Sequence, residues 1–91
     1  MSHRVKVKID GNQHDIVDAL FAVGCTVQTL ALVGAGCPDL LAARRGQMWL
    51  FEVKQPGEKP NELQRKWHET WDAPVHVVHT AEEAINALEA R

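Results

Sequence analysis

Residues 36–54 read Gly-Cys-Pro-Asp-Leu-Leu-Ala-Ala-Arg-Arg-Gly-Gln-Met-Trp-Leu-Phe-Glu-Val-Lys, and this stretch decides the fold. Two apolar runs, residues 39–44 and 47–53, lie on either side of Arg45 and Gly46. Short apolar runs that flank a two-residue turn containing glycine are typical of a β-hairpin. The sequence therefore predicts two antiparallel strands joined by a tight turn.

The register of this hairpin brings charged side chains together at the end farthest from the turn. A turn centred between residues 45 and 46 places Asp39 opposite Glu52, and Cys37 opposite Lys54. Directly opposed residues direct their side chains to the same face of the sheet, and residues two apart on a strand also share a face. We therefore expect Asp39, Glu52 and Lys54 to converge on one spot.

These three residues suit the hydrolysis of a phosphodiester bond. Two opposed carboxylates repel each other unless a positive charge lies between them. Mg²⁺ provides such a charge, and it commonly uses one or two protein carboxylates and keeps several waters. The metal would polarise the phosphate, and Lys54 would stabilise its charge or position the attacking water. The ordinary alternative is an Asp in a turn and an exposed Glu-Lys pair at a strand end.

The rest of the chain predicts helices and strands that surround the hairpin. In chain order these are a helix capped by Asn12 and ended by Gly24, a strand over residues 25–33, a helix capped by Asn61, a strand over 75–79, and a helix that follows Thr80. Leu63, Trp67 and Trp71 form a stripe with helical spacing, which we expect to lie in the core. The order predicts an α/β domain with a single mixed sheet flanked by helices.

A chain of 91 residues accommodates one domain, which we expect to span residues 1–91. Residues 4–9 alternate apolar and basic side chains, so residues 1–10 are expected to form an edge strand or an extended arm. In a dimer, this arm is a candidate for an added strand.

The net charge of −2 does not by itself indicate a nucleic-acid-binding protein. The excess acid lies near the C-terminus, in Glu82, Glu83 and Glu89, and residues 1–79 carry nine basic and nine acidic side chains. A bound divalent cation would reverse the local sign of the charge at the carboxylates. We therefore expect any affinity for DNA to be weak and sensitive to salt.

Two further features bear on the compartment of the protein. Cys25 and Cys37 lack CxxC spacing and fit reduced thiols better than a disulfide or a zinc site. No apolar run approaches the length of about 20 residues that a membrane span needs, and no signal-peptide core follows the N-terminus. We expect a cytoplasmic protein with no membrane association.

Three motifs carry a resemblance to a known family, and they are Gly36-Cys37-Pro38-Asp39, Phe51-Glu52-Val53-Lys54 and Gln64. They resemble the VRR-NUC (virus-type replication–repair nuclease) branch of the PD-(D/E)xK nucleases, especially its short stand-alone members from phages and bacteria. The resemblance extends from about Asn12 to Leu88. It implies a restriction-endonuclease-like αβββαβ core, here followed by a C-terminal helix. It also implies Mg²⁺- or Mn²⁺-dependent cleavage of structured DNA, such as flaps or four-way junctions, by a homodimer.

The resemblance also implies roles for individual residues. Asp39 and Glu52 correspond to metal ligands, Lys54 to the catalytic lysine, Gln64 to the glutamine on the next helix, and Gln28 to the glutamine before the Pro-Asp motif. The family usually has Glu on its first helix, and the matching position here is Asp15, which makes Asp15 a third candidate metal ligand. Its side chain is one methylene shorter and would reach a metal through water. Alternatively, Asp15 complements the dipole of its helix.

Other residues and functions remain open. Gln64 is a candidate to hold a water or a phosphate near the metal, whereas its i+4 neighbour His68 is expected to be an exposed helix residue. The principal alternative function is a non-catalytic DNA-binding or assembly module that keeps the nuclease fold. A small protein-interaction domain is a third candidate, and it would bind neither metal nor DNA.

Overall fold

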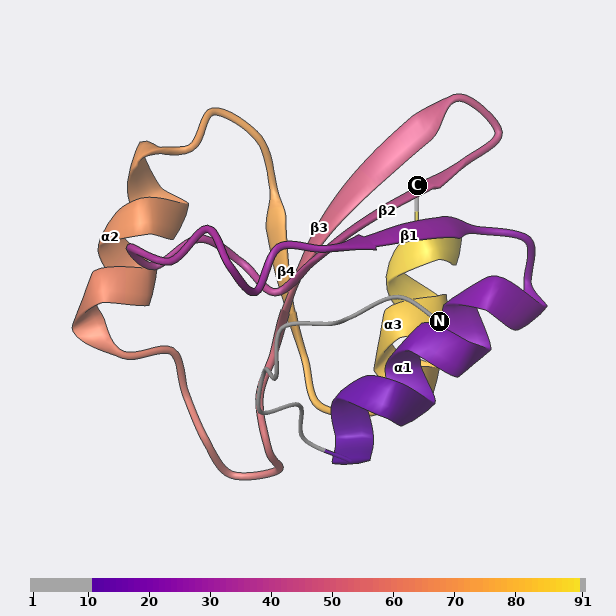
Figure 1. Ribbon diagram of the computed structural model, residues 1–91, viewed down its shortest axis with the longest axis horizontal. Helices are drawn as coiled ribbons and strands as arrows, with labels where there is room; N and C mark the ends of the chain where they lie inside the picture. The colour runs from indigo at the N-terminus through magenta and orange to yellow at the C-terminus, as the bar shows by residue number, and fades with distance from the viewer. Residues whose placement is uncertain (1–10, 91) are drawn as a thin grey trace, which may run out of the picture.

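The protein is described by a computed structural model that covers residues 11–90, so the predicted N-terminal arm lies outside the described residues. The elements are α1 (Gly11–Ala22), β1 (Thr26–Thr29), β2 (Leu40–Arg44), β3 (Gln47–Val53), α2 (Glu62–Thr70), β4 (Val75–Val78) and α3 (Ala81–Glu89) (Figure 1). This order confirms the predicted α/β fold, with an αβββαβ core and a C-terminal helix.

The hairpin of β2 and β3 has the predicted register. Leu40 pairs with Phe51, and Arg44 pairs with Gln47. The turn between them uses positive φ angles at both central residues, 53° at Arg45 and 80° at Gly46. Such angles define the tight turns whose twist matches that of the flanking strands. The turn therefore fixes which side chains of the two strands face each other.

The four strands form one mixed sheet in the order β1-β2-β3-β4. The first two pairs are antiparallel, and β3 and β4 are parallel. A parallel pair needs a crossover connection, and here the crossover contains α2. The C-terminal ends of β3 and β4 therefore lie at the same edge of the sheet, beside the start of β2.

One face of the sheet holds the hydrophobic core. Helices α1 and α3 lie side by side over this face (Figure 1). They bury Ile16, Leu20, Ala84 and Leu88 against strand residues that include the fully buried Phe51. None of the three helices in residues 11–90 is long and apolar enough to cross a membrane.

Helix α2 lies apart from the other two helices and buries none of its residues (Figure 1). The expectation that its apolar stripe joins the core is wrong, because Leu63 is 58% exposed and Trp71 is 49% exposed. Its position depends on a close approach at Gly36, where φ is +85° and an added Cβ would lie 2.5 Å from the carbonyl oxygen of Leu63. Glycine at this position therefore allows the loop before β2 to pack against α2.

Two predicted boundaries differ from the structure. The strand expected over residues 25–33 ends at Thr29, and the chain then turns through Gly34, Ala35 and Gly36, which all have positive φ angles. Asn12 was expected to cap α1 but lies inside its first turn. Its side chain instead donates hydrogen bonds to two carbonyl oxygens at the ends of β3 and β4.

Candidate active site

Asp39 is held by the backbone of β3 at the far end of the hairpin. Its N–H donates to the carbonyl oxygen of Phe51 at 3.0 Å, which continues the ladder of β2 and β3 by one residue. Its carboxylate Oδ2 accepts the N–H of Val53 at 2.7 Å. These two contacts fix Asp39 opposite Glu52, where the predicted register places it.

Glu52 is a buried acid, with only 1% of its surface exposed. Burial, followed by hydrogen bonding with Asp39 and the charge of Asp39, raises the pKa of Glu52 to about 8, while the charge of Lys54 opposes this shift. A buried carboxylate beside a second carboxylate favours its protonated form. A cation placed at the pair would favour the ionised form instead.

Two side chains of α2 reach the two carboxylate oxygens of Glu52. Gln64 Nε2 donates to Oε2 at 3.3 Å, and His68 Nε2 lies 3.1 Å from Oε1. The orientation of the Gln64 amide follows from the start of the helix, because its Oε1 accepts the N–H of Asn61 at 2.9 Å. Gln64 is thus both part of the capping box of α2 and a partner of Glu52.

Sequence reasoning did not assign His68 to the site. Its side chain is 16% exposed, whereas an exposed helix residue was expected. Burial and then the charge of Lys54 lower the pKa of His68, so its neutral form is favoured. The signal that points to it is its i+4 spacing from Gln64, which places both side chains on one face of α2.

Lys54 directly follows β3, and two other elements hold its backbone. Its N–H donates to the carbonyl oxygen of Val78 at 3.0 Å, and its own carbonyl oxygen accepts Asn12 Nδ2 at 2.8 Å. Lys54 lies two residues after Glu52, and residues two apart on an extended chain share a face, so Lys54 belongs to the same side of the sheet as Glu52. Asp39, Glu52, Lys54 and Gln64 therefore form one cluster.

The structure does not bring Asp15 or Gln28 into this cluster. Asp15 is exposed on α1, and within residues 11–90 no group of three or more His, Cys, Asp or Glu side chains is arranged to hold a metal. Gln28 is exposed on the edge strand β1 and donates to the carbonyl oxygen of Thr29 at 3.0 Å. Asn12 of α1 contacts the site through the backbone of Lys54.

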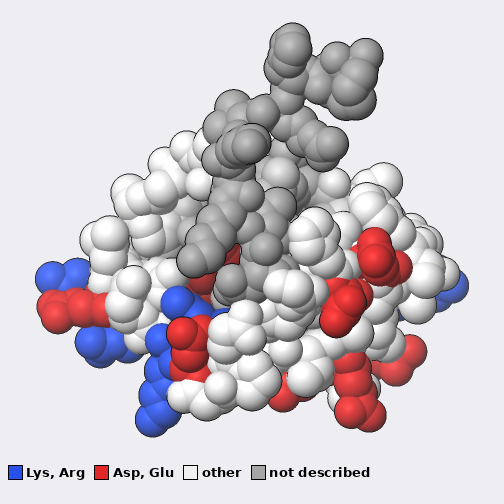
Figure 2. Space-filling model, turned by 60° about the horizontal axis from the view of Figure 1, so that its bottom comes forward, with Lys and Arg blue, Asp and Glu red and all other residues white. Residues whose placement is uncertain are grey.

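Charge is unevenly distributed over the surface. Figure 2 shows most of the visible Lys and Arg side chains on the side of the molecule that carries α2, with acidic side chains among them, and mostly acidic side chains on the opposite side. In and next to α2, Lys59, Arg65 and Lys66 are exposed, and so are Glu58, Glu62 and Glu69. Lys66 Nζ lies 3.5 Å from Glu62 Oε2. Basic side chains are therefore present where α2 borders the cluster, and neighbouring acids offset their charge.

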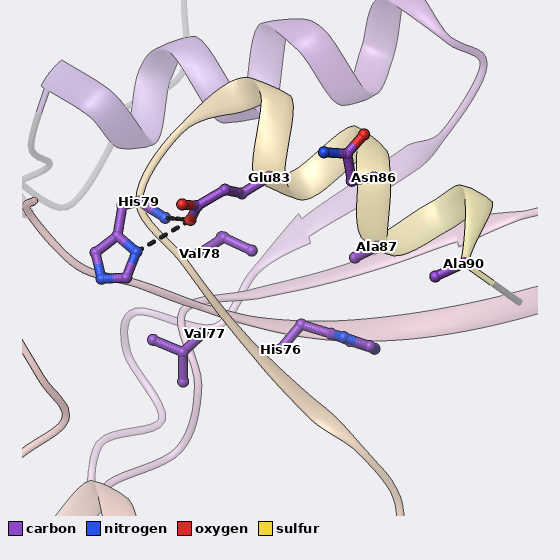
Figure 3. A pocket seen from close by; sticks show the side chains of 8 residues that line it. All are labelled: His76, Val77, Val78, His79, Glu83, Asn86, Ala87 and Ala90. Carbon is purple, nitrogen blue, oxygen red and sulfur yellow. Dashed lines mark hydrogen bonds and ion pairs between the residues drawn. The ribbon is translucent and has the colours of Figure 1, made fainter.

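A hollow of about 430 Å³ lies between β4 and α3, and neither Asp39 nor Glu52 lines it (Figure 3). Within it, Glu83 Oε1 accepts the N–H of His79 at 2.7 Å and lies 3.0 Å from its Nδ1. Hydrogen bonds to Glu83 and to the carbonyl oxygen of Glu58 raise the pKa of His79. These contacts tie the start of α3 to the loop before α2, which is a structural role.

Comparisons with known proteins agree with the fold and the motifs. No family model matches the sequence, and no curated protein matches it. A solved structure described as a VRR_NUC domain matches with a TM-score of 0.71 and 32% sequence identity. The match covers 85% of this chain and 89% of that chain. The chain therefore belongs to the VRR-NUC family and is a nuclease-type domain.

Proposed function

We propose that this domain is a Mg²⁺- or Mn²⁺-dependent DNA endonuclease in which Asp39 and Glu52 hold the metal and Lys54 acts on the scissile phosphate. The observation that carries the proposal is the burial of Glu52, 1% exposed, beside a second carboxylate and a lysine. Burying an acid in this way is costly unless a cation or a proton accompanies it. A structural role for the pair would be served better by apolar or neutral side chains.

The chemistry of the pair fits a hard divalent cation. Carboxylate oxygens are preferred ligands of Mg²⁺, which often takes only one or two of them from the protein. When bound, the metal would supply positive charge that polarises the phosphate and makes a neighbouring water more acidic. Asp15 is exposed on α1, so we assign it no direct contact with the metal.

The side chains around the pair have distinct roles. Gln64 and His68 contact separate oxygens of Glu52, and such partners fix the orientation of a ligand. Lys54 is anchored through its backbone to β4 and α1. Its ammonium stabilises negative charge that develops on the attacked phosphate. Because Lys54 directly follows the strand that carries Glu52, the two groups act on the same phosphate.

The proposed substrate is structured DNA, such as a flap or a four-way junction, cut by a homodimer. A four-way junction presents two symmetric strands, and two copies of the domain would place one cluster at each strand. Exposed Lys59, Arg65 and Lys66, in and next to α2, are candidates to contact the phosphate backbone. Sedimentation of the protein alone and with junction DNA tests the dimer.

Cleavage assays test the enzyme. Labelled single-stranded, duplex, flap and junction DNA would be incubated with Mn²⁺, Mg²⁺ or EDTA. We expect metal-dependent cutting that Lys54→Ala reduces about 100-fold or more, whereas Arg45→Ala, at the far tip of the hairpin, retains it. Cutting in EDTA, or full cutting by Lys54→Ala, would indicate a contaminant. Folded wild-type protein that binds DNA but cuts none of these substrates would favour the non-catalytic binding module.

Calorimetric titration with Mn²⁺ tests the ligands separately. We expect Asp39→Asn to weaken binding about tenfold or more and Asp15→Asn to change it less than about twofold. An equal loss in the two variants would show that a third carboxylate acts on the metal. Binding that neither Asp39→Asn nor Glu52→Gln weakens would contradict the assignment of the pair.

A further inference from the structure

An apolar hollow of about 420 Å³ lies beside the carboxylate cluster. Side chains of β2 and β3 line one part of it, and the end of α2 and the loop before β4 line another. It differs from the hollow between β4 and α3 because its lining is almost entirely apolar and aromatic. Concave apolar sites of this size commonly hold a ligand.

The floor of this hollow and the carboxylates belong to the same face of the sheet. On β3, Leu50 lies two residues before Glu52, and residues two apart share a face. On the neighbouring strand, Leu41 lies two residues after Asp39 and pairs directly with Leu50. Leu41 and Leu50 both line the hollow. The apolar floor is therefore the direct continuation of the carboxylate pair along both strands.

Cys37 marks the border between the hollow and the carboxylates. It lines the hollow, and it lies only two residues before Asp39 in the chain, with Pro38 between them. A molecule that fills the hollow therefore lies next to any phosphate bound at the carboxylates.

Aromatic rings at the C-terminal end of α2 form one wall, Trp67 from the helix and Trp71 from its C-cap position. Trp67 and Trp71 stack with ring centroids 4.7 Å apart and an interplanar angle of 19°. Both line the hollow, and Trp71 is 49% exposed. Leaving much of a tryptophan in water forgoes a large hydrophobic contribution, so this exposure is explained if a partner covers the ring.

We propose that the hollow binds an unpaired nucleobase of the DNA strand whose phosphate lies at Asp39 and Glu52, with Trp71 as the stacking surface. The inference rests on the proposed nuclease function and names its substrate class as DNA with an unpaired nucleotide at the cut. A base is covalently tied to the phosphate backbone, and its flat apolar face suits an aromatic wall. A base in an intact duplex is stacked between its neighbours and is not available to this wall.

The chemistry of the lining also predicts that the hollow does not distinguish one base from another. Recognition of one base over another requires hydrogen-bond donors and acceptors at its edge, and the lining is almost entirely apolar. Stacking alone is tolerant of sequence. We therefore expect selection for unpaired over paired nucleotides, with little preference among the four bases.

Binding in EDTA, where no cutting occurs, tests the proposal. The probes are fluorescently labelled single-stranded oligothymidylate and an oligomer of equal length that lacks bases, compared by anisotropy. Stacking of one base predicts about 5- to 100-fold tighter binding of the oligomer with bases. The chain has three tryptophans and no tyrosine, so quenching of its intrinsic fluorescence by oligothymidylate, and not by the base-free oligomer, is a second readout.

Three variants locate the effect. Trp71→Ala is expected to weaken binding of oligothymidylate by a similar factor and to leave binding of the base-free oligomer unchanged. Trp71→Phe, which keeps an aromatic ring, is expected to restore most of the affinity. Phe21→Ala removes a ring that is 54% exposed on α1, far from the lining, and is expected to have no effect. The comparison of the two oligomers on wild-type protein does not depend on the folding of any variant.

The outcomes separate this inference from the proposed function. Metal-dependent cutting with equal affinity for the two oligomers would overturn the base site and leave the nuclease intact. A wild-type dimer that Trp71→Ala dissociates in sedimentation would show that the hollow is an interface between copies, and it would also overturn the base site. No binding and no cutting by folded protein would remove the proposed function and the base site together.

Discussion

The Nε2 atom of His68 lies 3.1 Å from Oε1 of Glu52, while Gln64 contacts the other oxygen of the same carboxylate. Side chains of α2 thus contact both carboxylate oxygens of Glu52, a buried acid of β3. The contact links two segments that are 16 residues apart in the chain. It makes the orientation of Glu52 depend on the position of α2.

The contact between His68 and Glu52 predicts that His68→Ala weakens both Mn²⁺ affinity and DNA cleavage by about 10- to 100-fold, because partners of a metal ligand usually have effects of this size. His68→Gln, which retains a hydrogen-bond donor, is expected to recover part of both. Calorimetry with Mn²⁺ separates a positioning role from a general loss of folding. Unchanged Mn²⁺ affinity in His68→Ala would contradict the role.

The stability of the metal-free protein should fall as the pH rises toward 8. The pKa of Glu52 is raised from its ordinary value of 4.5 to about 8. Between these values the folded protein holds a proton that the unfolded chain has released. The stabilising effect is fully present below pH 4.5 and is lost as the pH rises through 8, by roughly 1.4 kcal/mol per pH unit.

Urea unfolding in EDTA at pH 6.5 and pH 8 measures this trend against Glu52→Gln as the control. We expect wild type to lose about 1–2 kcal/mol more than the variant. The variant is needed because the raised pKa of His79 contributes a loss in the same direction. Below pH 6.5, the lowered pKa of His68 adds the opposite trend. Equal slopes in wild type and variant would show that Glu52 is ionised in the metal-free fold.

Gly36→Ala should displace α2 and reduce cleavage. The new Cβ would lie 2.5 Å from the carbonyl oxygen of Leu63, at a backbone φ of +85°. Gly34→Ala is the matched control. Gly34 has a similar φ of +75°, but a Cβ added there would meet no atom within 4 Å. Both variants carry the backbone strain of about 1–2 kcal/mol, and only Gly36→Ala adds the clash. Equal losses of stability and activity would show that strain alone accounts for the effect.

Asn12→Ala should destabilise the fold by about 1–3 kcal/mol, because it leaves two partly buried carbonyl groups without their donor. Asn12 Nδ2 lies 2.8 Å from the carbonyl oxygen of Lys54 and 3.2 Å from that of His79. Its loss frees the backbone beside Lys54, so cleavage should fall even at temperatures where the variant stays folded. Thermal unfolding followed by circular dichroism measures the loss of stability. Cleavage measured about 20 °C below the unfolding midpoint of the variant, where the protein stays folded, measures the loss of activity.

The hairpin and its charged end were predictable because they depend on local rules. A two-residue turn fixes the register of the two strands, and the register in turn fixes which side chains are opposed. The position of Asp39 opposite Glu52 followed from counting residues outward from Arg45 and Gly46. Helix α2 was predictable for the same reason, since Asn61 is a local N-cap signal, and the structure shows that it forms a capping box with Gln64.

The errors concern contacts between distant segments. An apolar stripe on a helix shows that one face avoids water, but not whether a core or a ligand covers it, so Trp71 was misplaced. The role of His68 in the site could not be predicted, because it depends on the position of α2 over the end of β3. Asn12 satisfies carbonyl groups 42 and 67 residues away, and no local pattern distinguishes this role from a helix cap.

Helix α2 buries none of its residues, whereas α1 and α3 share the core with the sheet. Segments with few buried apolar contacts open with free energies well below that of global unfolding. Backbone amides of α2 should therefore exchange with deuterium earlier than those of α1, while the sheet remains protected. Gln64 and His68 both belong to this helix. When α2 opens, both side chains therefore leave Glu52 together, while the core stays folded.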